Sequence, residues 1–365
     1  MCQQHKQDTY VVAPSPEPLA PRAVVRNKRD APAEVATATT TQAPTTTTTR
    51  ATEAKLPAVC TLHRNDNHLV CSSGEQNENL IVEIALREDA VSSTDPINTG
   101  SWFDKIRPQN VSIVGPMFSN DLELLFTLNF TSVEIAEIKG FSESTFDLSL
   151  LNNFTNLQAL SIGGNYLDSI LPGPNCNLST GFATQDACAF PLGAQITTLD
   201  LQRNVLADLS SDFFLLFPNL QVLDWSRNHV RQLTPATFEV MPRLRRLSLT
   251  HNLVEDLPAD IFAALTQLQQ LQLQENAITH VHEHCFRALS SLQHLDLSDN
   301  PLAHLPPTLF APLTALTELR LDRARVGSID TNLFEHNTML QLLRLRSEDE
   351  GALRVVGGLQ QPLLL

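Results

Sequence analysis

The sequence predicts an α/β solenoid, and three observations lead to that fold class. A pattern returns every 24 residues between residues 196 and 345. Each copy holds a Leu-x-Leu segment, whose alternation places both leucines on one face of a short strand. Each regular copy also carries an asparagine three residues after the second leucine. Because one copy cannot bury its leucines alone, the copies must stack into one continuous core.

Four consecutive copies show the repeat. Their recurring residues are Leu220, Leu223, Trp225, Asn228, Val230, Leu233 and Phe238, then Leu244, Leu247, Leu249, Asn252, Val254, Leu257 and Phe262, then Leu268, Leu271, Leu273, Asn276, Ile278, Val281 and Phe286, then Leu292, Leu295, Leu297, Asn300, Leu302, Leu305 and Phe310. The form LxxLxLxxNxL at this period indicates a leucine-rich-repeat horseshoe. We therefore expect a concave parallel β-sheet and an irregular or short-helical convex side.

The repeats resemble the extracellular typical leucine-rich-repeat family, LxxLxLxxNxLxxLxxxxFxxLxx. That family includes Toll-like receptor ectodomains, chaoptin, Slit and related insect-type secreted or cell-surface proteins. The resemblance is specific over residues 196–345 and weaker upstream. It implies recognition in adhesion, signalling or innate immunity, although a shared fold does not by itself fix a function.

Two ladders of repeated side chains are expected to be structural. The asparagines lie where each strand turns toward the convex side, so their amides should satisfy backbone groups in that turn; they are Asn204, Asn228, Asn252, Asn276 and Asn300. The phenylalanines should stack as a convex-side spine; they are Phe214, Phe238, Phe262, Phe286, Phe310 and Phe334.

Residues 1–58 form a predicted disordered arm rich in proline and threonine, a composition that cannot bury enough apolar surface to fold. The sequence ending at Arg29 looks like the RxKR site of furin-type convertases. A solvated basic cluster is the alternative interpretation of those residues.

Residues 59–108 are the predicted N-terminal cap, which an array needs to cover its first core layer. Secreted members of the family usually have cysteine-stapled caps, and the local pair Cys60 and Cys71 would serve here. Six cysteines allow 15 pairings, so proximity alone favours this one. The alternation of Leu80, Val82, Ile84 and Leu86 predicts the first strand of the cap.

Residues 109–346 are the predicted repeats, interrupted by a loop insertion at 171–195. Cys176 and Cys188 lie in that insertion, and a disulfide between them would shorten and order the loop. The loop is either a recognition element or a tolerated surface insertion. Residues 347–365 are an irregular end without a cysteine cap, so we expect either a longer natural chain or a partner subunit over the last layer.

Charge and sequons bear on location. The net charge is −15, which disfavours binding to nucleic acid or to an anionic membrane surface. The chain has no apolar run long enough for a membrane span and no recognisable signal peptide, so membrane association would need a segment outside this sequence. Four N-glycosylation sequons nevertheless favour an extracellular, secreted or cell-surface protein; they start at Asn110, Asn129, Asn153 and Asn177.

The outward side of the strands is the predicted partner-binding surface. Its central column is Ser161, Asp200, Asp224, Ser248, Gln272, Asp296, Arg320 and Arg344, with the neighbours Arg203, Arg227, His251, Glu275, Asp299 and Arg323. Successive rungs about 4.8 Å apart would make a continuous polar strip that orients a protein ligand or receptor. A merely solvated face is the alternative.

The sequence offers few motifs typical of metal binding or catalysis. His280, His282 and His284 alternate beside Cys285, but that cysteine aligns with apolar repeat positions, so a buried thiol is favoured over a metal ligand. The sequence contains no GxSxG, P-loop, HExxH or GxGxxG motif. We expect no enzyme, no cofactor and no metal.

Two functions remain. The first is a protein-binding recognition protein that acts through its concave face. The second is a secreted structural scaffold or matrix protein that associates with copies of itself, for example as a homodimer, through its repeats.

Overall fold

The structure of the protein is a computed structural model. It describes residues 59–63, 68–72, 79–85, 110–125, 130–173, 190–345 without 208, 210, 303 and 327, and 354–356. All of these belong to one compact unit, Ala54–Leu365. Within these ranges, no helix is both long and apolar enough to cross a membrane.

In the described part of this unit, 13 strands form one sheet. Its strands, in spatial order, are β1 (Val59–His63), β2 (His68–Ser72), β3 (Asn79–Ala85), β4 (Asn110–Met117), β5 (Ile135–Phe141), β7 (Ala159–Ser161), β9 (Thr198–Asp200), β10 (Val222–Asp224), β11 (Arg246–Ser248), β13 (Gln270–Gln272), β15 (His294–Asp296), β16 (Glu318–Arg320) and β18 (Leu342–Arg344). The pairs from β1 to β4 are antiparallel, and every pair from β4 onward is parallel. The predicted solenoid with a parallel sheet is therefore confirmed.

The 24-residue period sets the register of the regular rungs. Leu223 lies opposite Leu199 on one side and Leu247 on the other, and all three side chains are about 1% exposed. The second leucine of each copy is buried as well, as in Leu249, Leu273 and Leu297. Stacking thus converts a repeated apolar pattern into one continuous core.

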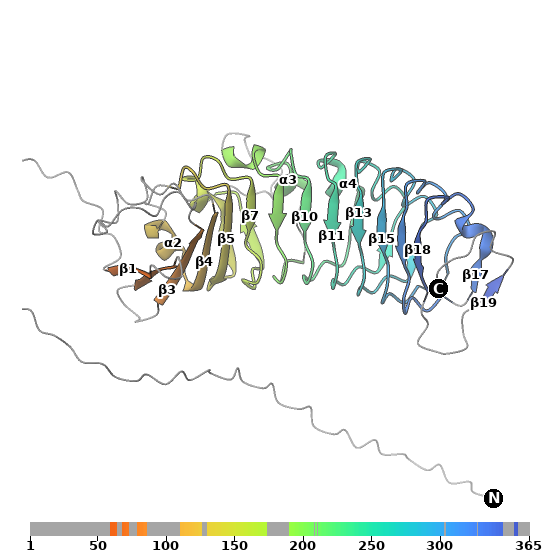
Figure 1. Cartoon of the computed structure of the whole chain (residues 1–365), viewed down its shortest axis with the longest axis horizontal. Coiled ribbons are helices and arrows are strands. Elements are labelled where there is room, and N and C mark those ends of the chain that lie inside the picture. Colours follow the sequence, from red (N-terminus) through yellow and green to blue (C-terminus); the bar gives the residue numbers. More distant parts are fainter. Residues whose placement is uncertain are drawn as a thin grey trace, which may run out of the picture. The chain divides into compact units, whose positions relative to one another are not determined.

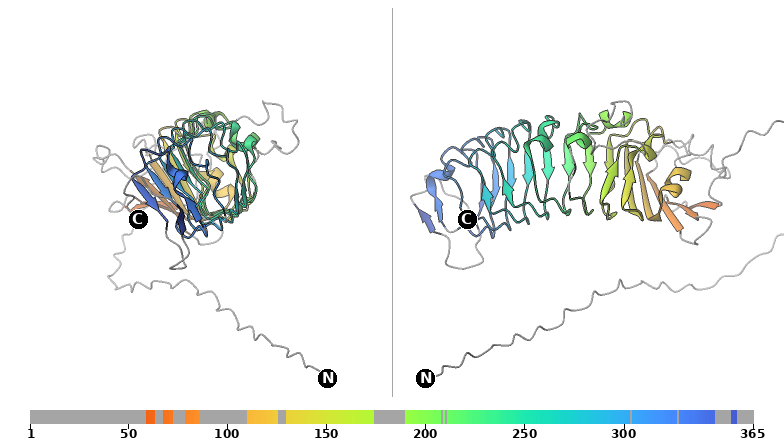
Figure 2. Two further views of the ribbon diagram at one scale, coloured as in Figure 1. Left: turned by 90° about the vertical axis from the view of Figure 1, so that its right-hand side faces the viewer. Right: turned by 180° about the vertical axis from the view of Figure 1, so that it is seen from behind.

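The side opposite the sheet is made of short helices and small strand pairs. The helices are α2 (Ser119–Leu125), η2 (Leu148–Leu151), η4 (Pro191–Ala194), α3 (Ser211–Phe214), α4 (Pro235–Glu239) and η5 (Thr331–Phe334). The pairs are β6 (Thr145–Asp147) with β8 (Ser169–Leu171), β12 (Asp256–Leu257) with β14 (His280–Val281), and β17 (Ser328–Asp330) with β19 (Arg354–Val356). Figure 1 shows the strands of the sheet in one row, with α3 and α4 above them, and Figure 2 shows the same row from two other sides. The predicted short-helical convex side is confirmed.

The asparagine ladder has the predicted structural role. The Asn252 side chain is 5% exposed; its oxygen accepts from the Val230 N–H at 3.0 Å, and its nitrogen donates to the Trp225 carbonyl at 2.9 Å. Asn204, Asn228, Asn276 and Asn300 make the equivalent bonds, and Asn165 extends the ladder upstream. Each amide therefore joins two neighbouring coils through backbone groups that the turn leaves unpaired.

The phenylalanine spine is confirmed from Phe238 to Phe334, with ring centroids 5.5, 6.1, 6.4 and 5.9 Å apart along the series. The prediction was wrong in placing Phe214 in this row. Its ring instead contacts Trp225 at 5.5 Å and Phe213 at 5.2 Å. Trp225 occupies a position that holds leucine in the next copies, and its larger ring supplies the contact that a neighbouring phenylalanine makes elsewhere.

Three antiparallel strands, β1 to β3, extend the sheet at its N-terminal edge. The alternation that predicted a strand falls in β3, which ends at Ala85, one residue short of Leu86. Among the described strands it is the third and not the first, because β1 and β2 precede it. Cys60 and Cys71 are direct partners in the register of β1 and β2.

Several expectations fall outside the described residues. They concern the arm at 1–58 with Arg29, the core of the insertion with Cys176 and Cys188, the sequons at Asn129 and Asn177, and most of 347–365. The insertion is entered from β8 and left through η4. These expectations stay predictions.

Candidate functional site: the concave strip

The outward side of the sheet carries two columns of side chains, and the sequence predicted only one of them. The predicted column holds the last residue of each three-residue strand, from Ser161 and Asp200 to Arg320 and Arg344. The second column holds the first residue of each strand. Its members are Ala159, Thr198, Val222, Arg246, Gln270, His294, Glu318 and Leu342. We call both columns together the concave strip.

The signal for the missed column is present in the sequence. In each strand only the middle residue is buried, and the residues on both sides of it face outward. Strand alternation places residues two apart on the same face. The residue before the first leucine of each Leu-x-Leu segment therefore belongs to the strip as surely as the residue after it.

Three aspartates of the predicted column also hold the backbone at the strand ends. The Oδ1 atoms of Asp200, Asp224 and Asp296 each accept the N–H two residues on, from Gln202, Ser226 and Ser298, at 3.0 Å. Such Asx-type bonds are local backbone caps. These carboxylates thus have a structural role besides any contact with a partner, so a test of their charge must keep the oxygen acceptor.

The predicted neighbours of the column lie in the turn beyond the strands. All six have left-handed backbone with φ between 54° and 58°; they are Arg203, Arg227, His251, Glu275, Asp299 and Arg323. Gly140 and Gly164 hold the same place in two upstream coils, with φ of 86° and 75°. We call the six non-glycine residues the turn row. Their side chains border the strip at the carboxyl ends of its strands.

Contacts along the turn row join adjacent coils. Nη2 of Arg227 lies 2.9 Å from Nε2 of His251, and Nδ1 of His251 lies 2.8 Å from a Glu275 oxygen. Because a guanidinium only donates, Nε2 accepts and Nδ1–H donates to the carboxylate. Further along, Arg323 makes a two-pronged bond to Asp299. The structure therefore brings five of the six residues into contact.

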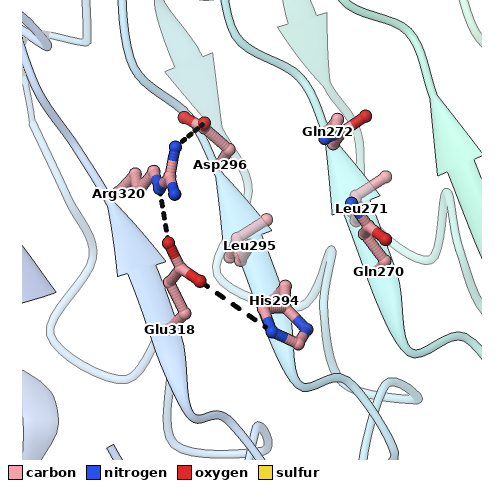
Figure 3. Close-up of a pocket in the computed structure, with 8 residues that line it drawn as sticks. All are labelled: Gln270, Leu271, Gln272, His294, Leu295, Asp296, Glu318 and Arg320. Carbon is pink, nitrogen blue, oxygen red and sulfur yellow. Dashed lines mark hydrogen bonds and ion pairs between the residues drawn. The ribbon is translucent and has the colours of Figure 1, made fainter. Parts of the chain in front are cut away.

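A shallow hollow of about 90 Å³ lies over β13, β15 and β16 (Figure 3). Gln270 and Gln272 line one side of it. On the other side, Nε of Arg320 bonds Glu318 and its Nη1 lies 4.0 Å from Asp296, while Nε2 of His294 lies 3.8 Å from Glu318. Arg320 thus lies between two carboxylates, and each of them has a cationic neighbour within the protein. Three of the lining residues, Gln270, His294 and Glu318, belong to the column that the sequence missed.

On β5, one rung beyond the N-terminal end of the strip, Glu137 is also paired. Burial would raise the pKa of Glu137, but hydrogen bonds from Lys139 and Ser112 lower that pKa below its usual value. Ser112 donates to the carboxylate at 2.7 Å. A compensated carboxylate therefore lies beside this end of the strip.

The histidine and cysteine cluster behaves as a structural feature. Cys285 is a free thiol that is 1% exposed, and burial raises its pKa, so the reactive thiolate is disfavoured. The rings of His282 and His284 lie 5.4 Å apart, and His280 lies 3.2 Å from Asp256. In the described part of the chain, no three His, Cys, Asp or Glu residues are placed to hold a metal ion.

Two sequons lie within the described ranges. Asn153 is exposed at the turn after η2, on the convex side. Asn110 begins β4, between β3 and β5, and its side-chain oxygen is buried without a hydrogen-bond partner. Glycosylation of both stays a prediction; Asn153 is exposed, whereas Asn110 is half-buried.

Comparisons with known proteins agree with this geometry. A family model for leucine-rich repeats matches residues 194–254 and 242–302. The solved complex of TLR13 with ssRNA13 aligns at 18% identity and a TM-score of 0.53, covering 66% of this chain and 37% of that one. The solved Toll–Spatzle complex, a molecular hub in Drosophila development and innate immunity, aligns at 18% identity and a TM-score of 0.55. This alignment covers 77% of this chain and 33% of that one.

These likenesses show the fold, a leucine-rich-repeat horseshoe similar to the ectodomains of Toll and Toll-like receptors. The chain spans about a third of the length of those two structures. No curated protein matches the sequence significantly.

Proposed function

We propose that this leucine-rich-repeat chain binds a protein partner on the concave strip, as an extracellular or cell-surface recognition protein. The observation that carries the proposal is the strip itself, in which eight parallel strands place two columns of mostly polar and charged side chains side by side. Solenoid arrays commonly use such extended concave surfaces for binding.

The character of the strip favours a protein over a small molecule. Its hollow is shallow and lined by glutamines and ion pairs, whereas small-molecule sites are deep and mostly apolar. The chain has a net charge of −15, which argues against nucleic acid. The complexes of TLR13 with RNA and of Toll with Spatzle show that similar folds bind macromolecules, and here we propose a protein.

A pair of bulky substitutions tests which face binds. Gln272 lies in the middle of the strip, on β13, and Ala263 is exposed in the convex turn after Phe262. Binders are first isolated with the wild-type chain from a display library of extracellular protein domains. Binding of each selected domain to Gln272→Trp and Ala263→Trp is then measured by surface plasmon resonance.

We expect Gln272→Trp to weaken binding by at least about tenfold and Ala263→Trp to leave it within about twofold, because only the first side chain would obstruct a concave contact. Circular dichroism and the melting temperature check that both variants fold. The opposite order, with a loss only for Ala263→Trp, would assign binding to the convex side and overturn the proposal.

A further inference from the structure

The carboxylates of the concave strip that lack an ionic partner lie side by side on strands β9 and β10. Asp200 and Asp224 are the two strand carboxylates of the described strip that take part in none of its ion pairs. By contrast, Glu137, Asp296 and Glu318 each have a cationic neighbour. The carboxylates on either side of this segment therefore have a cationic neighbour, and the two inside it do not. The exposed Arg344 on β18 is a further charged group of the strip without a described ion pair.

The two aspartates are also direct neighbours. Asp224 is the register partner of Asp200 on the adjacent parallel strand, so two like charges face each other across one rung. Their hydrogen bonds come from uncharged donors. Asp200 accepts from the Ser161 hydroxyl at 2.8 Å and the Gln202 amide at 3.1 Å, and both aspartates accept a backbone N–H. Neutral donors hold the carboxylates in place but leave the repulsion between them.

Two cations beside them are likewise without an ionic partner. Arg203 precedes the ladder asparagine in the turn row, and Arg246 begins β11; both are exposed, and neither joins a described ion pair or side-chain hydrogen bond. Arg203 is the one residue of the turn row that makes none of the side-chain contacts formed among the other five. Between these charges, Thr198 and Val222 give a small, mostly apolar floor.

We infer that β9 to β11 is the contact centre of the strip, and that it takes a protein segment bearing both signs of charge. A lysine or arginine of the partner would lie on Asp200 and Asp224, and acidic side chains would face Arg203 and Arg246. The aliphatic stem of the basic residue fits over Thr198 and Val222. This inference rests on the proposed function, because it specifies where on the concave strip the partner binds.

The hydrogen bonds at the strand ends supply reporters for a test. The N–H groups of Gln202 and Ser226 point at the two uncompensated carboxylates, and the N–H of Ser298 makes the same 3.0 Å bond to Asp296, which lies near Arg320. Ser298 is thus a matched internal control. All three amides can be followed by proton–nitrogen NMR of the deuterated full chain at low salt.

The probes are three blocked five-residue peptides of alanine, with lysine, acetyl-lysine or glutamate at the second and fourth positions. We expect the lysine peptide to shift the NMR signals of the Gln202 and Ser226 amides at concentrations about fivefold lower than those that shift the Ser298 amide signal. The reason is that Asp296, which accepts the Ser298 N–H, already has Arg320 beside it. The acetyl-lysine peptide should shift none of them. The glutamate peptide should shift the side-chain Nε–H signals of Arg203 and Arg246 before that of Arg323.

Matched variants separate charge from structure. Asp224→Asn keeps the oxygen acceptor for Ser226 and removes the charge, so it should fold and lose the Ser226 response to the lysine peptide. Asp296→Asn should leave that response unchanged. Three outcomes would overturn the assignment of the contact centre to β9–β11. The Ser298 amide could respond to the lysine peptide at the same or a lower concentration than Gln202 and Ser226, the acetyl-lysine peptide could shift the amides as much as the lysine peptide does, or no amide could shift. None of these outcomes decides whether a partner uses the concave face, which the bulky substitutions test separately.

Discussion

At the residue scale, the turn row places long side chains on backbone that suits glycine. A left-handed conformation costs an L-residue about 1–2 kcal/mol, and glycine avoids most of that cost. Gly140 and Gly164 show that glycine fits this place in the coil. Six coils instead carry Arg, His, Glu or Asp here. Strained non-glycine positions are a mark of functional surfaces, so the side chains of the turn row are candidates for partner contact.

Arg203 gives the cleanest measurement of this strain, because its side chain has no described contact to lose. We predict that Arg203→Gly unfolds with a free energy about 1 kcal/mol higher than Arg203→Ala, since alanine keeps the left-handed strain and glycine removes it. Urea unfolding of both variants measures the difference.

The same comparison carries its own control. Ser248→Gly against Ser248→Ala, at a strand position with ordinary extended backbone, should show glycine as the less stable variant. If glycine is also the less stable variant at position 203, the turn row is not strained and its charged residues need no functional explanation.

Sequence reasoning reaches some of these residue-level facts and not others. The repeat spacing identifies Asp200 and Asp224 as outward-facing, because alternation follows from the strand alone. It cannot show that Arg203 adopts a left-handed turn, since arginine has no preference for one. Nor can it show that Arg320 is neutralised by Asp296 and Glu318 while Arg246 is not. That distinction depends on side-chain directions across three rungs.

At the scale of elements, the N-terminal strands illustrate the limits of pattern. The apolar alternation of β3 is visible in the sequence, whereas β1 and β2 mix cysteine, threonine and histidine with a few apolar residues. Their strand character comes from pairing with β3, a tertiary effect that overrides weak local preference. The proximity of Cys60 and Cys71 in the sequence nonetheless points to the register that the structure adopts.

That register leads to a prediction about the cysteines. Direct partners on antiparallel strands have Cα atoms about 4.5–5.5 Å apart, which is within the range that a disulfide spans. We predict a disulfide between Cys60 and Cys71 in protein secreted under oxidising conditions, detectable by mass spectrometry of unreduced proteolytic peptides. Cys60→Ser should lower the free energy of unfolding by about 3 kcal/mol through loss of the closed loop.

Cys285 supplies the comparison for this experiment. It is buried and unpaired, so Cys285→Ala should leave the Cys60 to Cys71 peptide intact. Recovery of Cys60 linked to Cys176 or Cys188 in wild-type protein, or as a free thiol, would contradict the predicted pairing.

At the scale of the whole molecule, the repeat array makes stability nearly one-dimensional. Each coil contacts only its neighbours, through the leucine core, the asparagine ladder and the phenylalanine spine. Period and ladder are both readable from the sequence, which is why the array could be predicted in detail. The position of Phe214 could not be predicted, because its departure from the spine depends on the bulk of Trp225 in a neighbouring coil.

The spine gives a prediction about cooperativity. Phe286 is fully buried and stacks on Phe262 and Phe310, whereas Phe334 is partly buried and is described with one stacking neighbour, Phe310. We expect Phe286→Ala to cost about 3–5 kcal/mol and to split urea unfolding into two transitions, since it weakens the contact between two halves of the array. Phe334→Ala should cost less and leave one main transition.

The Phe286→Ala variant tests whether coupling between coils or loss of buried area governs the change in urea unfolding. If loss of buried area alone mattered, Phe286→Ala would shift a single transition to lower urea without splitting it. If the spine couples neighbouring coils, tryptophan fluorescence and circular dichroism should disagree in Phe286→Ala. Both tryptophans of the chain, Trp102 and Trp225, precede the break in the sequence, whereas circular dichroism reports both sides of it. Coincident transitions in the two signals would show that the array unfolds as one cooperative unit despite the missing ring.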